Sequence, residues 1–214
     1  MASMERKKYP KTPHLGCSPG ASSKATVVDS DSFFLNKEIV ITEKMDGECT
    51  GLTSNICHAR SIESADHSSR HWVKGLHSQI KNDIPVGWKI FGENMFAKHT
   101  IQYCNLKSYF LAFNVWNNNM ECLDWETTNE WFDKLGLSSP KCLYLGVCEK
   151  NTIKRFSDDF NSDKNKAEGF VVRTTSSFKY DRFGTHVAKW VKKDFIQTKH
   201  DWKHGEVTKN RMVR

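Results

Sequence analysis

The chain has 214 residues, a formal net charge of +7 and 12% aromatic residues. This length suffices for one large or two small domains with a substantial core, and the aromatic content excludes a largely disordered chain. The seven cysteines are odd in number and include no Cys-x-x-Cys pair. They argue against a disulfide framework or a zinc finger, and favour a reducing compartment.

Most of the excess positive charge lies at the C-terminal end, where residues 179–214 contain ten Lys or Arg against four Asp or Glu. A basic end of this kind suits polyphosphate or nucleic acid, and a merely solvated basic tail is the alternative. Residues 1–11 lack the apolar segment of a secretory signal, and no run approaches membrane-spanning length. We therefore expect a soluble, intracellular protein, without a distinction between cytoplasm and nucleus.

The first 32 residues predict a turn-rich arm. Three prolines and two glycines fall between residues 7 and 20, and no helical period is present. Such a composition is typical of irregular structure, so we expect this arm to lie across a domain rather than to form one. Lys8, Lys11 and His14 either contact nucleic acid or have a packing role.

The apolar run Ile39-Val40-Ile41 leads into Glu43-Lys44-Met45-Asp46-Gly47-Glu48. This pattern predicts a strand over residues 33–42 that ends in a turn, with residues 49–55 as its hairpin partner. A lysine attacks as a nucleophile only when it is neutral, so Lys44 needs burial or cationic neighbours for that role. Asp46 lies on the same side of an extended segment, where it can orient the amine or bind a metal. An exposed lysine beside a turn fits the motif equally well.

Two carboxylates occur beside strands further along the chain. Residues 88–91 predict a short strand that runs into Gly-Glu-Asn with Glu93, and residues 167–173 predict a strand that is opened by Glu168. A carboxylate at a strand end is well placed to enter a cleft. Either residue can also be an ordinary solvated turn residue.

Two more strands carry an aromatic side chain and a lysine at informative positions. Residues 108–116 are too aromatic and apolar for anything but a buried strand, on which Phe110 and Phe113 face opposite sides. One of these rings can stack on a nucleobase, or both can fill the core. Residues 187–195 predict a strand with Lys189 among apolar neighbours. A half-buried lysine needs an anionic partner, unless its stem packs along the sheet and the amine reaches water.

Helices are predicted over residues 72–84, by apolar periodicity, and over residues 124–135, with Asp124 as the N-terminal cap. Residues 143–148 predict another strand, and residues 151–166 a surface helix with a loop.

Taken in this order, the motifs resemble those of the covalent nucleotidyltransferases, the superfamily of polynucleotide ligases and RNA capping enzymes. The greatest resemblance is to small ATP-dependent RNA ligases, and it extends to residues 8–15 and 197–202. It implies an α+β nucleotidyltransferase (adenylation) domain of antiparallel sheets with flanking helices. This domain would span residues 33–196, between a turn-rich N-terminal arm (1–32) and a basic C-terminal tail (197–214).

The resemblance implies an ATP-dependent RNA ligase that joins RNA 5′-phosphate and 3′-hydroxyl ends. Lys44 would attack the α-phosphorus of ATP and carry AMP, which would pass to the RNA 5′-phosphate before the 3′-hydroxyl displaces it. Positioning and charge neutralisation dominate such displacements at phosphorus. The implied cofactors are ATP and Mg²⁺, with Mn²⁺ as a substitute.

The resemblance also assigns site residues. Mg²⁺ would lie near Asp46, Glu93 and Glu168, although Glu93 can instead bind the ribose hydroxyls. Phe113 would stack on adenine, and Arg60 would contact a phosphate or the RNA end. The implied catalytic residues are Lys44, Asp46, Glu93, Glu168, Lys189 and Lys192. The implied nucleotide-binding residues are Glu43, Lys44, Arg60, Glu93, Phe113, Lys189 and Lys192.

The chain departs from the family pattern at its last motif. Many ligases end with lysines spaced i, i+2, but here Val191 occupies i+2 and Lys192 occupies i+3. Either the strand bulges or Lys192 acts from another direction. The short remainder, residues 195–214, favours a minimal RNA ligase or a fragment of a longer protein, because ligases usually append a further domain there.

Two alternatives stay open. One is a nucleotidyltransferase that acts on a DNA nick or an RNA cap, and the other is a catalytically silent RNA-binding protein. The joint presence of Lys44, Glu93, Glu168 and Lys189 argues against the silent protein, because RNA binding does not require all four. The sequence leaves the oligomeric state undetermined.

Overall fold

The structure is a computed structural model that describes residues 7–29, 33–162, 167–193, 195 and 207–213. It divides into two compact units, each assembled from separate stretches of the chain. The Lys44 unit comprises Pro10–Met45 and Pro140–Gln197, and the Phe113 unit comprises Met1–Tyr9, Asp46–Ser139 and Thr198–Arg214. Both combine helices with sheets in which antiparallel pairing predominates, which confirms the predicted fold class.

The Lys44 unit contains a sheet with the strand order β2-β1-β12-β10-β3-β9. Its strands are β1 (His14–Leu15), β2 (Val27–Val28), β3 (Glu38–Lys44), β9 (Cys142–Val147), β10 (Gly169–Thr174) and β12 (Val187–Val191). The short β1 pairs in parallel with β12 and β2, and the other pairs are antiparallel. The same unit contains β11 (Phe178–Lys179) and the 3-10 helix η4 (Tyr180–Thr185).

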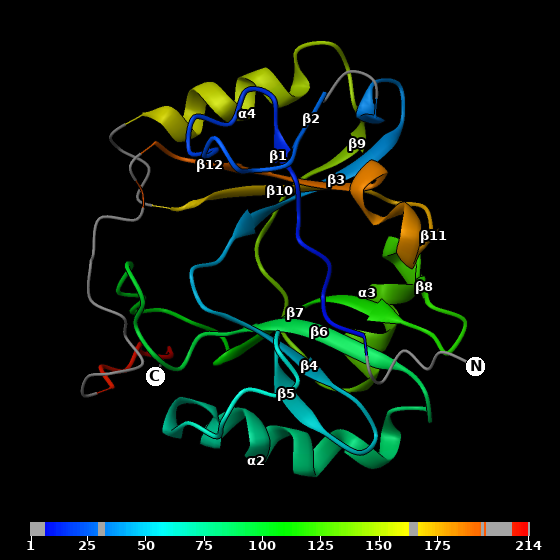
Figure 1. The fold of residues 1–214 in the computed structure, drawn as a ribbon, viewed down its shortest axis with the longest axis vertical. Helices are drawn as coiled ribbons and strands as arrows, with labels where there is room; N and C mark the ends of the chain where they lie inside the picture. Colours follow the sequence, from blue (N-terminus) through cyan, green and yellow to red (C-terminus); the bar gives the residue numbers. More distant parts are fainter. Residues whose placement is uncertain (1–6, 30–32, 163–166, 194, 196–206, 214) are drawn as a thin grey trace. The chain divides into compact units, whose positions relative to one another are not determined.

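One face of this sheet is covered by α4 (Thr152–Asn161), which lies across it in Figure 1. Ile153 and Phe160 of the helix belong to the same buried core as Ile39 and Ile41 of β3. Successive side chains of a strand point to opposite faces. The alternation along β3 therefore leaves Lys44 on the face that α4 does not cover.

The Phe113 unit contains a second sheet, in which neighbouring strands follow the order β8-β7-β6-β4-β5. The strands are β4 (Glu48–Leu52), β5 (Cys57–Ala59), β6 (Lys89–Asn94), β7 (Phe110–Trp116) and β8 (Glu121–Cys122). Helices α2 (His71–Ile80) and α3 (Trp125–Lys134) contribute Val73 and Phe132 to a core that includes Phe110. The short 3-10 helices η2 (Ser68–Arg70) and η3 (Lys81–Asp83) flank α2. The Asp124 side chain accepts from the Thr127 N–H at 2.9 Å and so caps α3 as predicted.

The predicted hairpin between residues 33–42 and 49–55 is wrong. Strand β3 pairs with β9 and β10, whereas β4 pairs with β5 and β6. The turn after Lys44 therefore leads from one unit into the other, and a local turn pattern does not reveal such distant partners. Strand β3 also begins at Glu38 rather than at Phe33, because Asn36 adopts a φ of 60° that interrupts an extended chain.

The two ends of the chain also depart from their predicted descriptions. The arm predicted as irregular contributes β1 and β2 to a sheet. In the C-terminal tail, only residues 207–213 are described, and they pack within the Phe113 unit: the Asn210 side chain donates to the carbonyls of Met95 and Ala97. Most of the predicted tail lies outside the described residues. None of the described helices is both long and apolar enough to span a membrane.

Candidate active site

The centre of the candidate site is a contact between Lys44 and Glu168. Lys44 is the last residue of β3 and aligns with Gly169, the first residue of β10. This register brings Glu168, the residue before Gly169, beside the lysine. The Lys44 Nζ donates to Glu168 Oε2 at 2.6 Å, and the two side chains are 22% and 11% exposed. The predicted nucleophile therefore has a proton acceptor within hydrogen-bond distance.

A second lysine lies on the same face of this sheet. The register aligns Lys189 of β12 with Val171 of β10, and Val171 with Thr42 of β3. Thr42 precedes Lys44 by two residues, so Lys189 and Lys44 project from one face. Buried Ala188 and Trp190 flank Lys189, which is itself half-buried as predicted. A face that carries two ammonium groups suits a phosphate ligand.

The structure does not bring Glu43 or Lys192 to this face. Glu43 alternates with Lys44 and aligns with Phe170 of the α4-facing core. Burial raises the pKa of its carboxyl, and Lys141 partly opposes that rise. Lys192 follows the last residue of β12, and its Nζ donates to the Ser162 carbonyl at 3.2 Å, at the end of α4. Lys192 thus points away from the Lys44 face here, and the nucleotide-binding roles of both residues stay predictions.

Asp46, in the Phe113 unit, holds a neighbouring loop. Its Oδ2 accepts from the backbone N–H groups of Thr100 and Ile101 at 2.7 and 2.8 Å, and its own N–H donates to the Tyr103 hydroxyl at 3.2 Å. Oδ1 takes no part in these bonds. Asp46 therefore has a positioning role that the sequence did not predict, and its predicted part in metal binding stays a prediction.

Gly47 places the turn against β6. A Cβ at this position would lie 2.6 Å from the Asn94 carbonyl oxygen and 2.9 Å from Glu93 Cγ. Because real Cβ atoms do not approach other atoms so closely, glycine is required here. The turn that follows Lys44 is thereby held next to Glu93, the second predicted carboxylate of this unit.

An ion pair in the Phe113 unit also escaped prediction. Arg70 Nε and Nη2 donate to the two carboxylate oxygens of Glu48, both at 2.7 Å, and Nη1 donates to the Ala65 carbonyl. The side chains of Arg70 and Glu48 are 7% and 10% exposed. This bidentate contact anchors the first residue of β4, and no local sequence pattern links the two residues.

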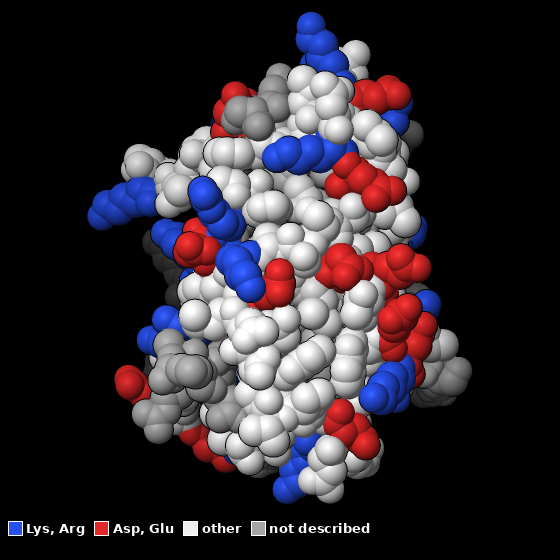
Figure 2. Space-filling model, turned by 90° about the vertical axis from the view of Figure 1, so that its right-hand side faces the viewer, with Lys and Arg blue, Asp and Glu red and all other residues white. Residues whose placement is uncertain are grey.

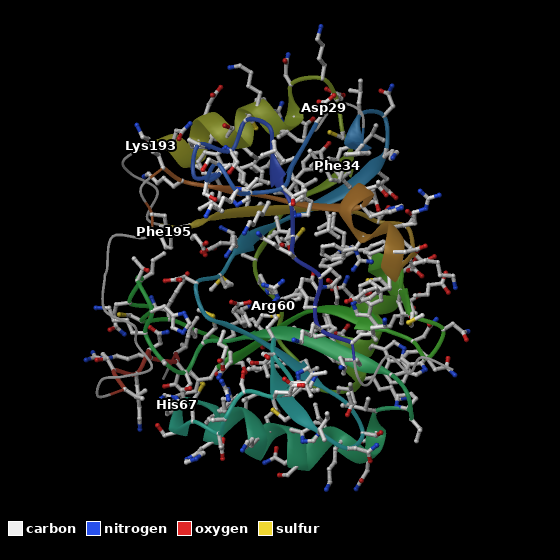
Figure 3. All side chains as sticks on the ribbon, viewed as in Figure 1. Asp29, Phe34, Arg60, His67, Lys193 and Phe195 are labelled. Carbon is white, nitrogen blue, oxygen red and sulfur yellow. The ribbon has the colours of Figure 1, made fainter. Side chains whose placement is uncertain are left out.

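Tyr9 connects two predicted site residues, Phe113 and Arg60. Its ring makes edge contacts with Phe113 at 5.1 Å and Phe91 at 5.0 Å between centroids, and its hydroxyl donates to Asn114 Oδ1 at 2.7 Å. The Tyr9 carbonyl accepts from Nε of Arg60, which follows β5 and is labelled in Figure 3. The resemblance of residues 8–15 to the ligase family was the signal that could have identified Tyr9.

Comparison with known proteins gives a consistent result. A sequence model described as RNA ligase matches residues 37–191. An archaeal ATP-dependent RNA ligase superposes with a TM-score of 0.59 at 13% identity, covering 86% of this chain and 48% of that one. A putative ATP-dependent DNA ligase from Aquifex aeolicus superposes with a TM-score of 0.58 at 16% identity, covering 86% of this chain and 50% of that one. A Naegleria gruberi RNA ligase variant with ATP and Mn superposes with a TM-score of 0.51 at 16% identity, covering 73% of this chain and 50% of that one.

The TM-scores show a shared fold, and at these low identities they show the fold alone; the chain spans about half the length of the structures it matches. A comparison with curated protein sequences gave no significant match. The family match, however, extends over more than half of the chain. It includes the strand that ends at Lys44, both sides of the Lys44–Glu168 contact, and Lys189 on the same face. This protein therefore belongs to the RNA ligase family.

Proposed function

We propose that the protein is an ATP-dependent RNA ligase that joins a 5′-phosphate to a 3′-hydroxyl through a Lys44-linked AMP. The observation that carries this proposal is the Lys44–Glu168 contact at 2.6 Å on a face that also bears Lys189. Membership of the RNA ligase family supports it, as does the fold shared with ligases that bind ATP.

In the first step, Nζ of Lys44 attacks the α-phosphorus of ATP. A nitrogen–phosphorus bond forms while the bond to the bridging oxygen breaks, and pyrophosphate leaves. Glu168 lies where it can accept the proton that the amine loses. Lys189 stabilises the charge that develops on the phosphates, which is the main catalytic contribution in phosphoryl transfer.

Two further displacements complete the reaction. An oxygen of the RNA 5′-phosphate attacks the phosphorus of the lysine-bound AMP, and the Lys44 amine leaves and regains a proton. The 3′-hydroxyl of the other RNA end then attacks the activated 5′-phosphorus, and AMP leaves. Arg60 is exposed and is the residue that we assign to an RNA end or phosphate.

The proposed divalent cation matches the chemistry of the predicted ligands. Asp46 and Glu93 of the Phe113 unit and Glu168 of the Lys44 unit are carboxylates, the ligands that Mg²⁺ prefers. Among the residues that the structure describes, no three His, Cys, Asp or Glu side chains form a metal-binding group. In nucleotide-binding sites, Mg²⁺ usually combines one or two protein carboxylates with substrate phosphates. When bound, the cation neutralises phosphate charge.

RNA is the proposed partner. Figure 2 shows one face of the molecule, where Lys and Arg side chains are interspersed with Asp and Glu. The positive excess is therefore not gathered on that face. We assign the RNA backbone contacts to the basic residues between 179 and 214. Within this range, residues 194, 196–206 and 214 lie outside the described part of the chain.

The test uses ATP that is labelled at its α-phosphate, with Mg²⁺ and the full chain. We expect intact-mass measurement to show one added AMP, and Lys44→Ala to show none. Labelling of Lys44→Ala equal to that of the wild type would exclude the covalent lysine, and an unlabelled wild type would favour the silent RNA-binding protein. The shared fold with a putative DNA ligase makes DNA ends the second candidate substrate. Sealing of RNA ends but not DNA ends by the labelled protein would support the RNA ligase.

A further inference from the structure

His14 is a buried histidine on the Lys44 face that the mechanism above does not use. It lies in β1, which joins the sheet beside β12, and the register aligns it directly with Lys189. Its neighbour Leu15 belongs to the core on the α4 side. Because side chains alternate along a strand, His14 projects from the opposite face, which carries Lys44 and Lys189. His14 itself is 9% exposed.

A serine fixes the orientation of the His14 ring. The Ser18 Oγ accepts from the Val191 N–H at 2.9 Å, and it lies 3.0 Å from His14 Nδ1 and 3.4 Å from the Val191 carbonyl oxygen. The hydroxyl has one proton, which it can donate either to the Val191 carbonyl or to Nδ1. When it donates to Nδ1, the proton of the neutral ring resides on Nε2, and a phosphate oxygen bound at Nε2 selects this tautomer.

The ring is neutral at physiological pH. Burial, together with the positive charges of Lys189, Lys44 and Lys11, lowers the pKa of His14 to about 4. Within the part of the chain that the structure describes, Nδ1 is the ring nitrogen of His14 that has a hydrogen-bond partner. In the tautomer with the proton on Nε2, the Nε2–H group is a donor on the face that carries the ammonium groups of Lys44 and Lys189. An acceptor that enters among these three donors has to be anionic or strongly polar.

We propose that His14 binds ATP phosphate, with Nε2–H as a neutral hydrogen-bond donor to the triphosphate that Lys44 attacks. This inference rests on the proposed function. A neutral donor adds a hydrogen bond to the phosphates without repelling the two lysines, which an imidazolium would do. Its contribution falls in the first step, because the triphosphate is absent once AMP has been transferred to RNA.

Two substitutions separate the donor from the packing of the ring. His14→Asn retains a side-chain acceptor for Ser18 but has no atom near the Nε2 position. His14→Gln is longer and places an amide N–H where Nε2–H lies. Both are neutral at all relevant pH values, so neither changes the charge of the face.

Three measurements on the full chain test the proposal: thermal melting, the single-turnover rate of self-adenylation, and sealing of RNA that already carries 5′-AMP. We expect His14→Asn to melt near the wild-type temperature and to lose about tenfold to a hundredfold in self-adenylation, the range for one hydrogen bond to a charged group. We expect His14→Gln to recover most of that loss, and both variants to seal pre-adenylated RNA at the wild-type rate. Near-normal self-adenylation by His14→Asn, or an equal loss in both reactions, would overturn the proposal.

Binding of inorganic pyrophosphate, measured by calorimetry, distinguishes this proposal from the proposed function because it requires no reaction. Weaker binding to His14→Asn than to wild type, with recovery in His14→Gln, supports the phosphate site even if Lys44 is never labelled. Equal binding to all three proteins overturns the phosphate site even if Lys44 is labelled normally.

Discussion

Two ion pairs begin only four residues apart in the sequence, at Lys44 and Glu48, but they differ in construction. In the Lys44–Glu168 pair, in the Lys44 unit, Lys44 Nζ lies 2.6 Å from Glu168 Oε2, and the lysine side chain is 22% exposed. The Glu48–Arg70 pair, in the Phe113 unit, has two contacts at 2.7 Å between side chains that are 10% and 7% exposed, and a further arginine nitrogen binds the Ala65 carbonyl.

The difference separates a reactive pair from a structural one. A nucleophile must remain reachable and must be able to leave its partner, and Lys44 meets both conditions. In the Glu48–Arg70 pair, both carboxylate oxygens and the guanidinium nitrogens are engaged with protein groups. Because these polar atoms already bind protein groups, the pair is poorly suited to bind a ligand. It instead fixes Glu48, the first residue of β4, directly after the Asp46-Gly47 turn.

The largest effect that we expect is a loss of stability in Arg70→Met, which removes the Glu48–Arg70 ion pair. Removing one partner leaves Glu48 buried without its counter-charge, which costs about 3–5 kcal/mol in the free energy of unfolding. Urea denaturation followed by tryptophan fluorescence measures the loss. The matched control is the double variant Glu48→Gln with Arg70→Met, which removes both charges and should recover much of the stability. A single variant as stable as the wild type would contradict the structural role.

On the Lys44 face, removal of a charge should affect the reaction rather than the fold. We expect Lys189→Met, which keeps the apolar stem, to melt near the wild-type temperature and to lose self-adenylation by about a hundredfold, the scale of one positioned charge in a transition state. Thermal melting checks that the variant stays folded, and the single-turnover rate of self-adenylation checks the loss of activity. A folded variant with a near-normal rate would show that Lys189 is an ordinary surface lysine.

The charged residues that local sequence revealed lie within strands or next to their ends. Lys44, Glu168 and Lys189 each lie in or beside a strongly apolar run, so alternation and a family resemblance sufficed to select them. Their meeting depends on the pairing of β3 with β10 and of β10 with β12. The order of the motifs in the family implied that meeting, and the strand patterns alone did not.

The contacts that sequence reasoning missed involve partners that are distant in the sequence. Arg70 contacts Glu48 across a loop, and the Asp46 carboxylate accepts from Thr100 and Ile101, far along the chain. His14 lay in an arm predicted as irregular, because a strand as short as His14–Leu15 has no detectable period. Its register with Lys189 arises from a parallel pairing between the two ends of the chain, which no local pattern encodes.

The smallest effect that we expect is from substitution of Phe113, because this residue is proposed to act through an aromatic ring rather than through a charge. Phe113 is half-buried, and Tyr9 contacts its ring edge-on at 67° between planes. Stacking of a base on an aromatic ring contributes about 1–3 kcal/mol. Phe113→Leu retains apolar bulk but removes the flat face, so we expect the KM for ATP to rise about tenfold while the rate at saturating ATP changes little.

Pyrophosphate supplies the control for Phe113→Leu, because it has phosphates but no base. We expect the variant to bind pyrophosphate as the wild type does, whereas His14→Asn should bind it more weakly. Tyr9→Phe keeps the ring contacts with Phe113 and removes the hydroxyl that donates to Asn114. It should leave the KM for ATP nearly unchanged. If Phe113→Leu instead weakened the binding of ATP and pyrophosphate equally, its effect would come from a disturbed fold and the adenine-stacking role would be wrong.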